Sequence, residues 1–112
     1  MSELNSDNTL PKSLILRSRL EIKDIFETGT FKRLKFVTLV YMKTELQKAG
    51  FFVTKKYGNA VKRNKVKRWL REIYRQNKSV FEGYSIVFLV NRPQRFTYND
   101  LADDILSRDL KL

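Results

Sequence analysis

Residues 55–78 read KKYGNAVKRNKVKRWLREIYRQNK, and this stretch decides how the rest of the chain must be arranged. It holds ten of the 23 Lys and Arg residues of the chain but only one acidic residue, Glu72. The stretch therefore carries an excess of nine positive charges, against a formal net charge of +11 for all 112 residues. Charge concentrated in this way is typical of a surface that binds a polyanion, with nucleic acid as the first candidate and an anionic membrane surface as the second.

The same stretch predicts one long helix over residues 60–77, with Asn59 as its N-cap after Gly58. At about 100° per residue, the apolar side chains collect on one face, which consists of Val66, Leu70 and Ile73, with Trp69 and Tyr74 at its edge. We expect this face to pack against a sheet.

The other side of the predicted helix is cationic. An arc of about 100° contains Asn64, Lys67, Arg68, Arg71 and Arg75, and no acid. Like charges three and four residues apart repel each other by about 0.2–0.5 kcal/mol per pair, and an ordinary solvated face mixes both signs. We therefore interpret the arc as a phosphate-binding face, for which the planar, bidentate Arg side chain is suited. The alternative is a face that only keeps the protein soluble.

A basic loop leads into this helix. Lys55 and Lys56 precede Gly58 and Asn59, and a helix N-terminus offers free backbone N–H groups and a positive dipole end to anions. We predict that this loop, Asn59 included, extends the phosphate-binding face of the helix.

The flanking sequence predicts a single α+β domain. A chain of 112 residues has the length of one domain. Residues 1–13 are polar and lack periodicity, so we expect a flexible tail and assign residues 14–112 to the domain. Residues 18–28 predict a short helix that begins with a Ser18–Glu21 capping box and ends before Gly29 in the left-handed C′ conformation.

Segments rich in β-branched and aromatic residues predict three strands, at residues 34–42, 50–54 and 85–90. The last of these is almost wholly apolar, as expected for a strand buried on both faces. A further short strand at residues 30–33 is only weakly signalled. Thr97 and Asp100 form a capping-box pattern that opens a last helix.

Composition excludes several classes of function. The chain has no Cys and no His, so it cannot form disulfides or thiolate zinc sites, and it lacks the commonest general base. No apolar run approaches the roughly 18 residues that span a bilayer, and no signal-peptide pattern follows the first Met. We expect a cytoplasmic protein with no membrane partner.

Three carboxylates near the start of the last predicted helix, Asp100, Asp103 and Asp104, are spaced at three and four residues. One interpretation is a Mg²⁺ site. The other, which we favour, is that acids close to a helix N-terminus are stabilised by the dipole and stay solvated. We therefore predict no catalytic residue and no metal site in the protein itself.

Aromatic residues are spread over the predicted strands, and we expect most of them in the core. A sheet with few helices leaves part of one face open, where aromatic rings can stack on unpaired bases. A groove between the first helix and the sheet, with Phe26 in its wall, is therefore a candidate site for single-stranded nucleic acid. The residues alone predict an RNA- or DNA-binding module.

Residues 54–72, TKKYGNAVKRNKVKRWLRE, resemble the signature of the bacterial ribonuclease P protein component, S-K-K-x-G-x-A-V-x-R-N-x-x-K-R-x-x-R. Only the first position differs, where Thr54 keeps the hydroxyl group of the Ser. Residues 25–29 resemble the end of the first helix in that family, and Thr97 and Tyr98 resemble the start of its last helix. The resemblance covers residues 14–107.

This resemblance implies a small α-β sandwich of order αβββαβα, in which a four-stranded sheet contains a left-handed βαβ crossover, a rare exception to the right-handed rule. It also implies the function of a protein subunit of ribonuclease P, which binds the catalytic RNA and the 5′ leader of precursor tRNA to promote endonucleolytic 5′-end maturation. Mg²⁺ bound by the RNA subunit would carry out the hydrolysis, and we expect one protein per RNA.

The family's RNA-binding motif carries over to Lys55, Lys56, Arg63, Asn64, Lys67, Arg68 and Arg71, and the loop and arc add Asn59 and Arg75. The leader cleft carries over to Ile22, Phe26, Leu39, Tyr41 and Phe52. Three of these depart from the family pattern: Ile22 replaces the first of two Phe residues, Leu39 stands where a Tyr is expected, with Tyr41 two residues later, and Phe52 replaces a Ser.

Two other functions stay open at this stage. The chain is alternatively a general RNA-binding or ribosome-associated protein without a role in cleavage. A third interpretation makes the protein itself a nuclease, which would have to use Asp100, Asp103 and Asp104.

Overall fold

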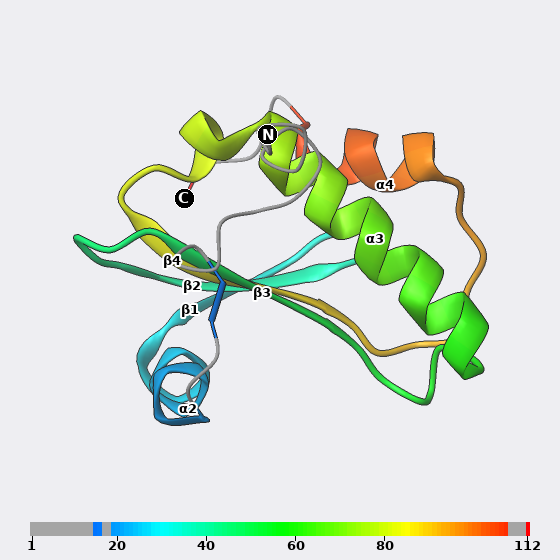
Figure 1. Ribbon diagram of the computed structural model, residues 1–112, viewed down its shortest axis with the longest axis horizontal. Coiled ribbons are helices and arrows are strands. Elements are labelled where there is room, and N and C mark those ends of the chain that lie inside the picture. The colour runs from blue at the N-terminus through cyan, green and yellow to red at the C-terminus, as the bar shows by residue number, and fades with distance from the viewer. Residues whose placement is uncertain (1–14, 17–18, 108–111) are drawn as a thin grey trace, which may run out of the picture.

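Four strands form one mixed sheet with helices on both of its faces (Figure 1). The computed structural model describes residues 15–16, 19–107 and 112. In chain order, the elements are α2 (Arg19–Thr28), β1 (Thr30–Arg33), β2 (Thr38–Lys43), β3 (Lys48–Val53), α3 (Ala60–Gln76), the 3-10 helix η2 (Lys78–Phe81), β4 (Tyr84–Val90) and α4 (Tyr98–Ile105). The tail expected at residues 1–13, and Ser18 of the expected capping box, lie outside the described residues.

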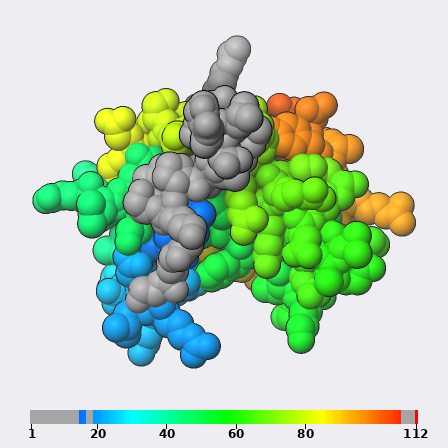
Figure 2. Space-filling model, in the orientation of Figure 1, coloured from blue at the N-terminus to red at the C-terminus, as the bar shows by residue number. Residues whose placement is uncertain are grey.

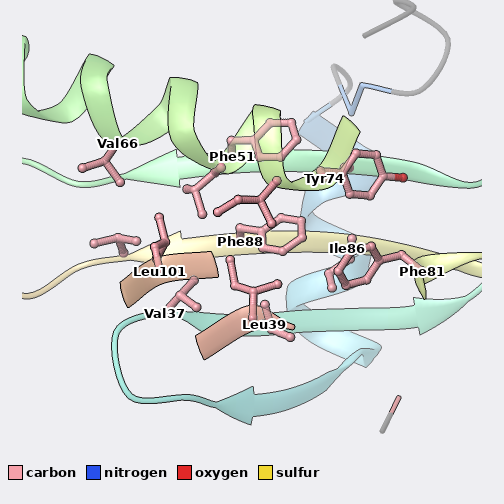
Figure 3. Packing of buried hydrophobic residues seen from close by; sticks show 14 of the residues in the cluster. Val37, Leu39, Phe51, Val66, Tyr74, Phe81, Ile86, Phe88 and Leu101 are labelled. Atoms are coloured by element: carbon pink, nitrogen blue, oxygen red, sulfur yellow. The ribbon is translucent and has the colours of Figure 1, made fainter. Parts of the chain in front are cut away.

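The strand order is β1-β2-β4-β3, and only β3 and β4 run parallel. The chain passes from β3 through α3 to β4, its neighbour in the sheet, and this crossover is left-handed (Figures 1 and 3). The order αβββαβα and the α+β class are therefore confirmed, including the weakly signalled strand β1. At the outer edge of β3, the backbone N–H of Leu16 donates to the carbonyl of Ala49 at 2.8 Å.

The main core lies between the sheet and α3, η2 and α4 (Figure 3). The predicted apolar face of α3 is confirmed, because Val66, Leu70 and Ile73 are at most 1% exposed. Tyr74, expected at the edge of this face, is fully buried instead. Its ring stacks on Phe81 at 5.5 Å between centroids, and its hydroxyl accepts a hydrogen bond of 2.9 Å from Gln47.

Burial of this phenol has an electrostatic consequence. Desolvation raises the pKa of Tyr74, and the hydrogen bond from Gln47 acts in the opposite direction. Because the polar end of the ring has a partner, the ring can enter the core without leaving an unsatisfied hydroxyl there.

Among the residues that the structure describes, the second face of the sheet carries α2 and a smaller core of Leu16, Ile25, Val40 and Val87. The prediction that Gly29 adopts a left-handed conformation is wrong, since Gly83, with φ of 87°, is the one described residue with positive φ. Gly29 is required for a different reason. A Cβ atom there would lie 2.4 Å from the carbonyl oxygen of Ile25 and 2.8 Å from that of Tyr41, which no side chain permits.

The strand predicted over residues 34–42 begins only at Thr38. The preceding residues form a turn closed by a hydrogen bond from Leu34 N to Val37 O at 2.8 Å. The backbone N–H groups of Lys35 and Phe36 donate to the Asp104 carboxylate of α4, at 3.0 and 2.8 Å. Leu34, Phe36 and Val37 are apolar because they pack in or against the main core from a turn, and not because they form a strand.

We predict that Leu70→Ala lowers the free energy of unfolding by about 2–5 kcal/mol, because it leaves a cavity beneath α3. Urea denaturation of both proteins measures the change. Arg68→Ala, on the exposed side of the same helix, is the matched control and should be nearly neutral. A loss below about 1 kcal/mol for Leu70→Ala would mean that the helix does not depend on this contact.

Candidate nucleic-acid interface

The loop before α3 is held in one conformation by hydrogen bonds of its own residues. Tyr57 N donates to Thr54 O at 3.0 Å, which closes a turn. Asn59 caps α3 as predicted, since its side-chain oxygen accepts from Lys62 N at 2.9 Å. The Arg63 guanidinium reaches back to the Gly58 carbonyl at 2.8 Å. Lys55 and Lys56 are thus presented from a fixed turn, and both are exposed.

The predicted cationic arc lies on the solvent side of α3. Asn64, Arg68 and Arg71 are exposed, and Lys67 and Arg75 are half-buried. In Figure 2, α3 and the loop before it (green) form a continuous part of the molecular surface. This is the geometry that a helix needs in order to follow a phosphate backbone.

The nine residues predicted to bind RNA divide into two groups. Five have side chains that form no hydrogen bond or ion pair with the described part of the chain: Lys55, Lys56, Asn64, Lys67 and Arg68. The other four also hold the protein together. Asn59 and Arg63 fix the loop, Arg71 lies over the Phe51 ring at 5.9 Å, and Arg75 pairs with an acid.

That acid is Glu72, which lies outside the arc but reaches into it. Its carboxylate accepts two hydrogen bonds from the Arg75 guanidinium, at 3.1 and 2.6 Å, and one from Gln76 at 2.6 Å. The hydrogen bond from Arg75 is the main reason why the pKa of Glu72 lies below its usual value. The carboxylate is therefore ionised at neutral pH, and the cationic surface is strongest at the N-terminal half of α3.

Aromatic side chains form a second surface, on the opposite face of the sheet. The Phe26 ring of α2 lies 6.2 Å from Phe31 of β1 and 6.5 Å from Phe52 of β3, between centroids. Ile22, Phe26 and Phe52 are half-buried, and Phe31 is 56% exposed. We call these four residues the α2-side surface.

Beside these rings, the surface of the sheet is formed by a row of paired residues on three neighbouring strands. Leu89 of β4 pairs with Thr38 of β2 and with Phe52 of β3, and all three are half-buried. They point to the α2 side because Val40 and Val87, two residues away on the same strands, pack under α2. This end of the sheet leads directly into Lys55 and the basic loop (Figure 1).

Two residues predicted for the leader cleft, Leu39 and Tyr41, do not lie on this surface. Both belong to the main core on the α3 side of the sheet, where they are 0% and 8% exposed. Alternate residues of a strand point to opposite faces, so Val40 and Met42 face α2 instead. Ile22, Phe26 and Phe52 are brought together as predicted, and Phe31, Thr38 and Leu89 are the neighbours that the prediction missed.

The carboxylates of α4 have structural roles. Thr97 and Asp100 form the predicted capping box, with bonds of 3.1 and 2.9 Å, and Asp104 accepts two backbone hydrogen bonds from residues 35 and 36. Asp103 is exposed. Within the described residues, no three potential ligands are grouped to hold a metal ion. The capping box fits the interpretation of helix stabilisation for Asp100, whereas Asp104, the last-but-one residue of α4, instead joins this helix to the turn before β2.

A family model described as Ribonuclease P matches residues 10–109. The chain belongs to the bacterial ribonuclease P protein family. The ribonuclease P protein component of Finegoldia magna is 39% identical over 100 residues, which cover 87% of this chain and 88% of the relative. That of Petrotoga mobilis is 32% identical over 112 residues, with 93% and 95% covered.

Solved structures agree with this membership. The ribonuclease P protein of Thermotoga maritima matches with a TM-score of 0.70 and 30% identity, over 81% of this chain and 90% of that one. The Staphylococcus aureus protein, at 23% identity, shares the fold, with a TM-score of 0.76 over 84% and 90%. Family membership gives the chain the role of a ribonuclease P subunit in tRNA processing.

The family motif also contains one unusual buried group. The Thr54 hydroxyl, which replaces the family's Ser, is buried and has no hydrogen-bond partner among the described residues. Its backbone N–H donates to Val90 O at 2.9 Å and so ties the end of β3 to β4.

Among residues 15–16, 19–107 and 112, no helix has the length and hydrophobicity needed to cross a bilayer.

We predict that Phe31→Ala weakens binding of an unstructured oligoribonucleotide by about 1–3 kcal/mol, because it removes an exposed stacking ring. Its free energy of unfolding should change by less than about 1 kcal/mol, since the ring is largely outside the core. Fluorescence anisotropy with a labelled oligonucleotide measures the affinity. Leu46→Ala, 69% exposed between β2 and β3, is the control, and equal losses in both variants would contradict a role for the α2-side surface.

Proposed function

We propose that the chain binds the catalytic RNA of ribonuclease P through the basic loop and the cationic arc of α3, and the 5′ leader of precursor tRNA across the α2-side surface. The observation that carries this proposal is the set of five side chains on the solvent side that have no partner among the described residues, on a loop and helix fixed by a buried apolar face. A rigid array of cations lowers the repulsion between two RNA molecules without having to be ordered on binding.

In this proposal the RNA subunit carries the chemistry. Mg²⁺ bound by the RNA supplies the hydrolysis of the phosphodiester bond, and the protein positions the two RNAs. The chain has no His or Cys to act as a base or nucleophile, and two of the three Asp residues of α4 accept structural hydrogen bonds. We propose one protein per catalytic RNA.

The test is reconstitution of the protein with a bacterial ribonuclease P RNA and a precursor tRNA at low Mg²⁺ concentration. The protein should increase the rate of 5′ cleavage and the affinity for substrate with a leader, and it should add little for substrate without one. No gain in either quantity would overturn the proposal. Sequencing of copurified RNA separates it from a general RNA-binding role, since one dominant non-ribosomal RNA is expected.

We predict that Arg68→Ala weakens binding of the catalytic RNA while the thermal midpoint stays unchanged, because the side chain is exposed and has no partner in the described chain. The slope of log K against log salt should become flatter by somewhat less than about one unit, as expected for one lost phosphate contact. Lys43→Ala, at the far end of β2, is the charge-matched control. The same slope in Arg68→Ala and in the unmodified protein would contradict the prediction.

A further inference from the structure

A cavity lies on the flank of α3, beside the cationic arc and the basic loop. It has a volume of about 330 Å³ and opens between the first half of α3 and the segment before α4. That segment (orange) runs beside the start of α3 in Figure 1. The cavity therefore joins the basic loop to a part of the chain that the family motif does not include.

Aromatic rings form the walls of this cavity. Tyr57, Trp69 and Phe96 line it, with Phe96 at 5.5 Å from Tyr57 and 6.4 Å from Trp69 between ring centroids. All three are half-buried, so each ring packs on one side and leaves part of its surface open. An open aromatic surface of this size accepts a flat, conjugated ring such as a nucleobase.

Cations form the rim. Lys62, Lys65 and Arg95 line the cavity, and no acidic residue of the described part of the chain does. The Lys65 ammonium lies 5.1 Å from the centroid of the Trp69 ring, so its charge is directed over the aromatic wall. The Gln94 amide also lines the cavity. Its nitrogen donates to Phe36 O at 2.9 Å, while its oxygen accepts no hydrogen bond from the described residues and can receive one from a base.

The cavity is continuous with the cationic arc of α3. Lys65 lies three residues before Arg68, and residues at this spacing are neighbours on a helix surface. The α2-side surface lies on the other face of the sheet. An RNA strand that follows the arc therefore reaches the cavity, whereas a strand on the α2-side surface would have to pass around the sheet.

We propose that this cavity binds one unstacked nucleotide of the RNA that lies along α3, with its base against Trp69 and Phe96 and its phosphate between Lys65 and Arg95. Aromatic walls match the base, and a cationic rim without acids matches the phosphate, so both parts of one nucleotide find complementary groups. The source of the nucleotide rests on the proposed function, in which that RNA is the catalytic subunit.

Trp69 is the single Trp of the chain, so its fluorescence reports directly on the cavity. Titration of the full-length protein with adenosine 5′-monophosphate and with an unstructured oligoadenylate should quench this fluorescence to a plateau. Ribose 5-phosphate, which has no base, should not quench it. The double variant Lys65→Gln/Arg95→Gln should weaken the apparent affinity about tenfold or more, because it removes charge-assisted contacts to phosphate. Lys43→Gln should behave like the unmodified protein.

A second arm identifies the source of the nucleotide. Catalytic RNA alone should quench the fluorescence of Trp69, and its affinity should fall in the double variant. Precursor tRNA alone should not quench this fluorescence, and its affinity should not change in the double variant. Quenching by precursor tRNA alone would overturn the assignment to the catalytic RNA. Absence of quenching by every nucleotide and RNA would overturn the cavity as a site, even if the protein still stimulates cleavage. Quenching without any stimulation of cleavage would leave the cavity supported and overturn the proposed function instead.

Discussion

Everything that the surface of α3 can do depends on one contact, the apolar stripe of Val66, Leu70, Ile73 and Tyr74 against the sheet. The helix needs this contact because its exposed side is crowded with like charges, each close pair of which costs about 0.2–0.5 kcal/mol. Burial of a single Leu or Ile side chain contributes about 1.5–3 kcal/mol. The stripe therefore outweighs the repulsion, and it fixes the direction in which every cation of the helix points.

The same packing explains why the two faces of the sheet differ. The α3, η2 and α4 elements cover one face, so Leu39 and Tyr41 are sealed in the main core. Within the described residues, α2 is the one helix on the other face, and Phe31 beside Phe26 is exposed there. The sheet thus holds a basic side and an aromatic side in fixed positions relative to each other, which suits the proposed role of bringing two RNAs together.

The sequence predicted well wherever a single strong pattern was present. The 3.6-residue spacing and Asn59 defined α3, its cap and its buried face, and the apolar run of β4 marked the central strand. The sequence does not show which side chains of β2 point to which face of the sheet. Leu39 and Tyr41 alternate with Val40 and Met42, and both pairs are apolar. The turn before β2 has the apolar pattern of a strand because its residues pack against the core. Two of its backbone N–H groups donate to Asp104, 68 and 69 residues away in sequence, and no local pattern indicates this contact.

The most direct test of the account uses the absence of Cys, which makes any introduced Cys a unique attachment point. An iron chelate that generates hydroxyl radicals is attached at Arg68→Cys or at Phe31→Cys, and the reconstituted complex with precursor tRNA is probed for strand cleavage. The account predicts cuts in the catalytic RNA from position 68 and cuts in the leader from position 31. Leader cuts from position 68, or the same cleavage pattern from both positions, would contradict the separation of the two RNA surfaces.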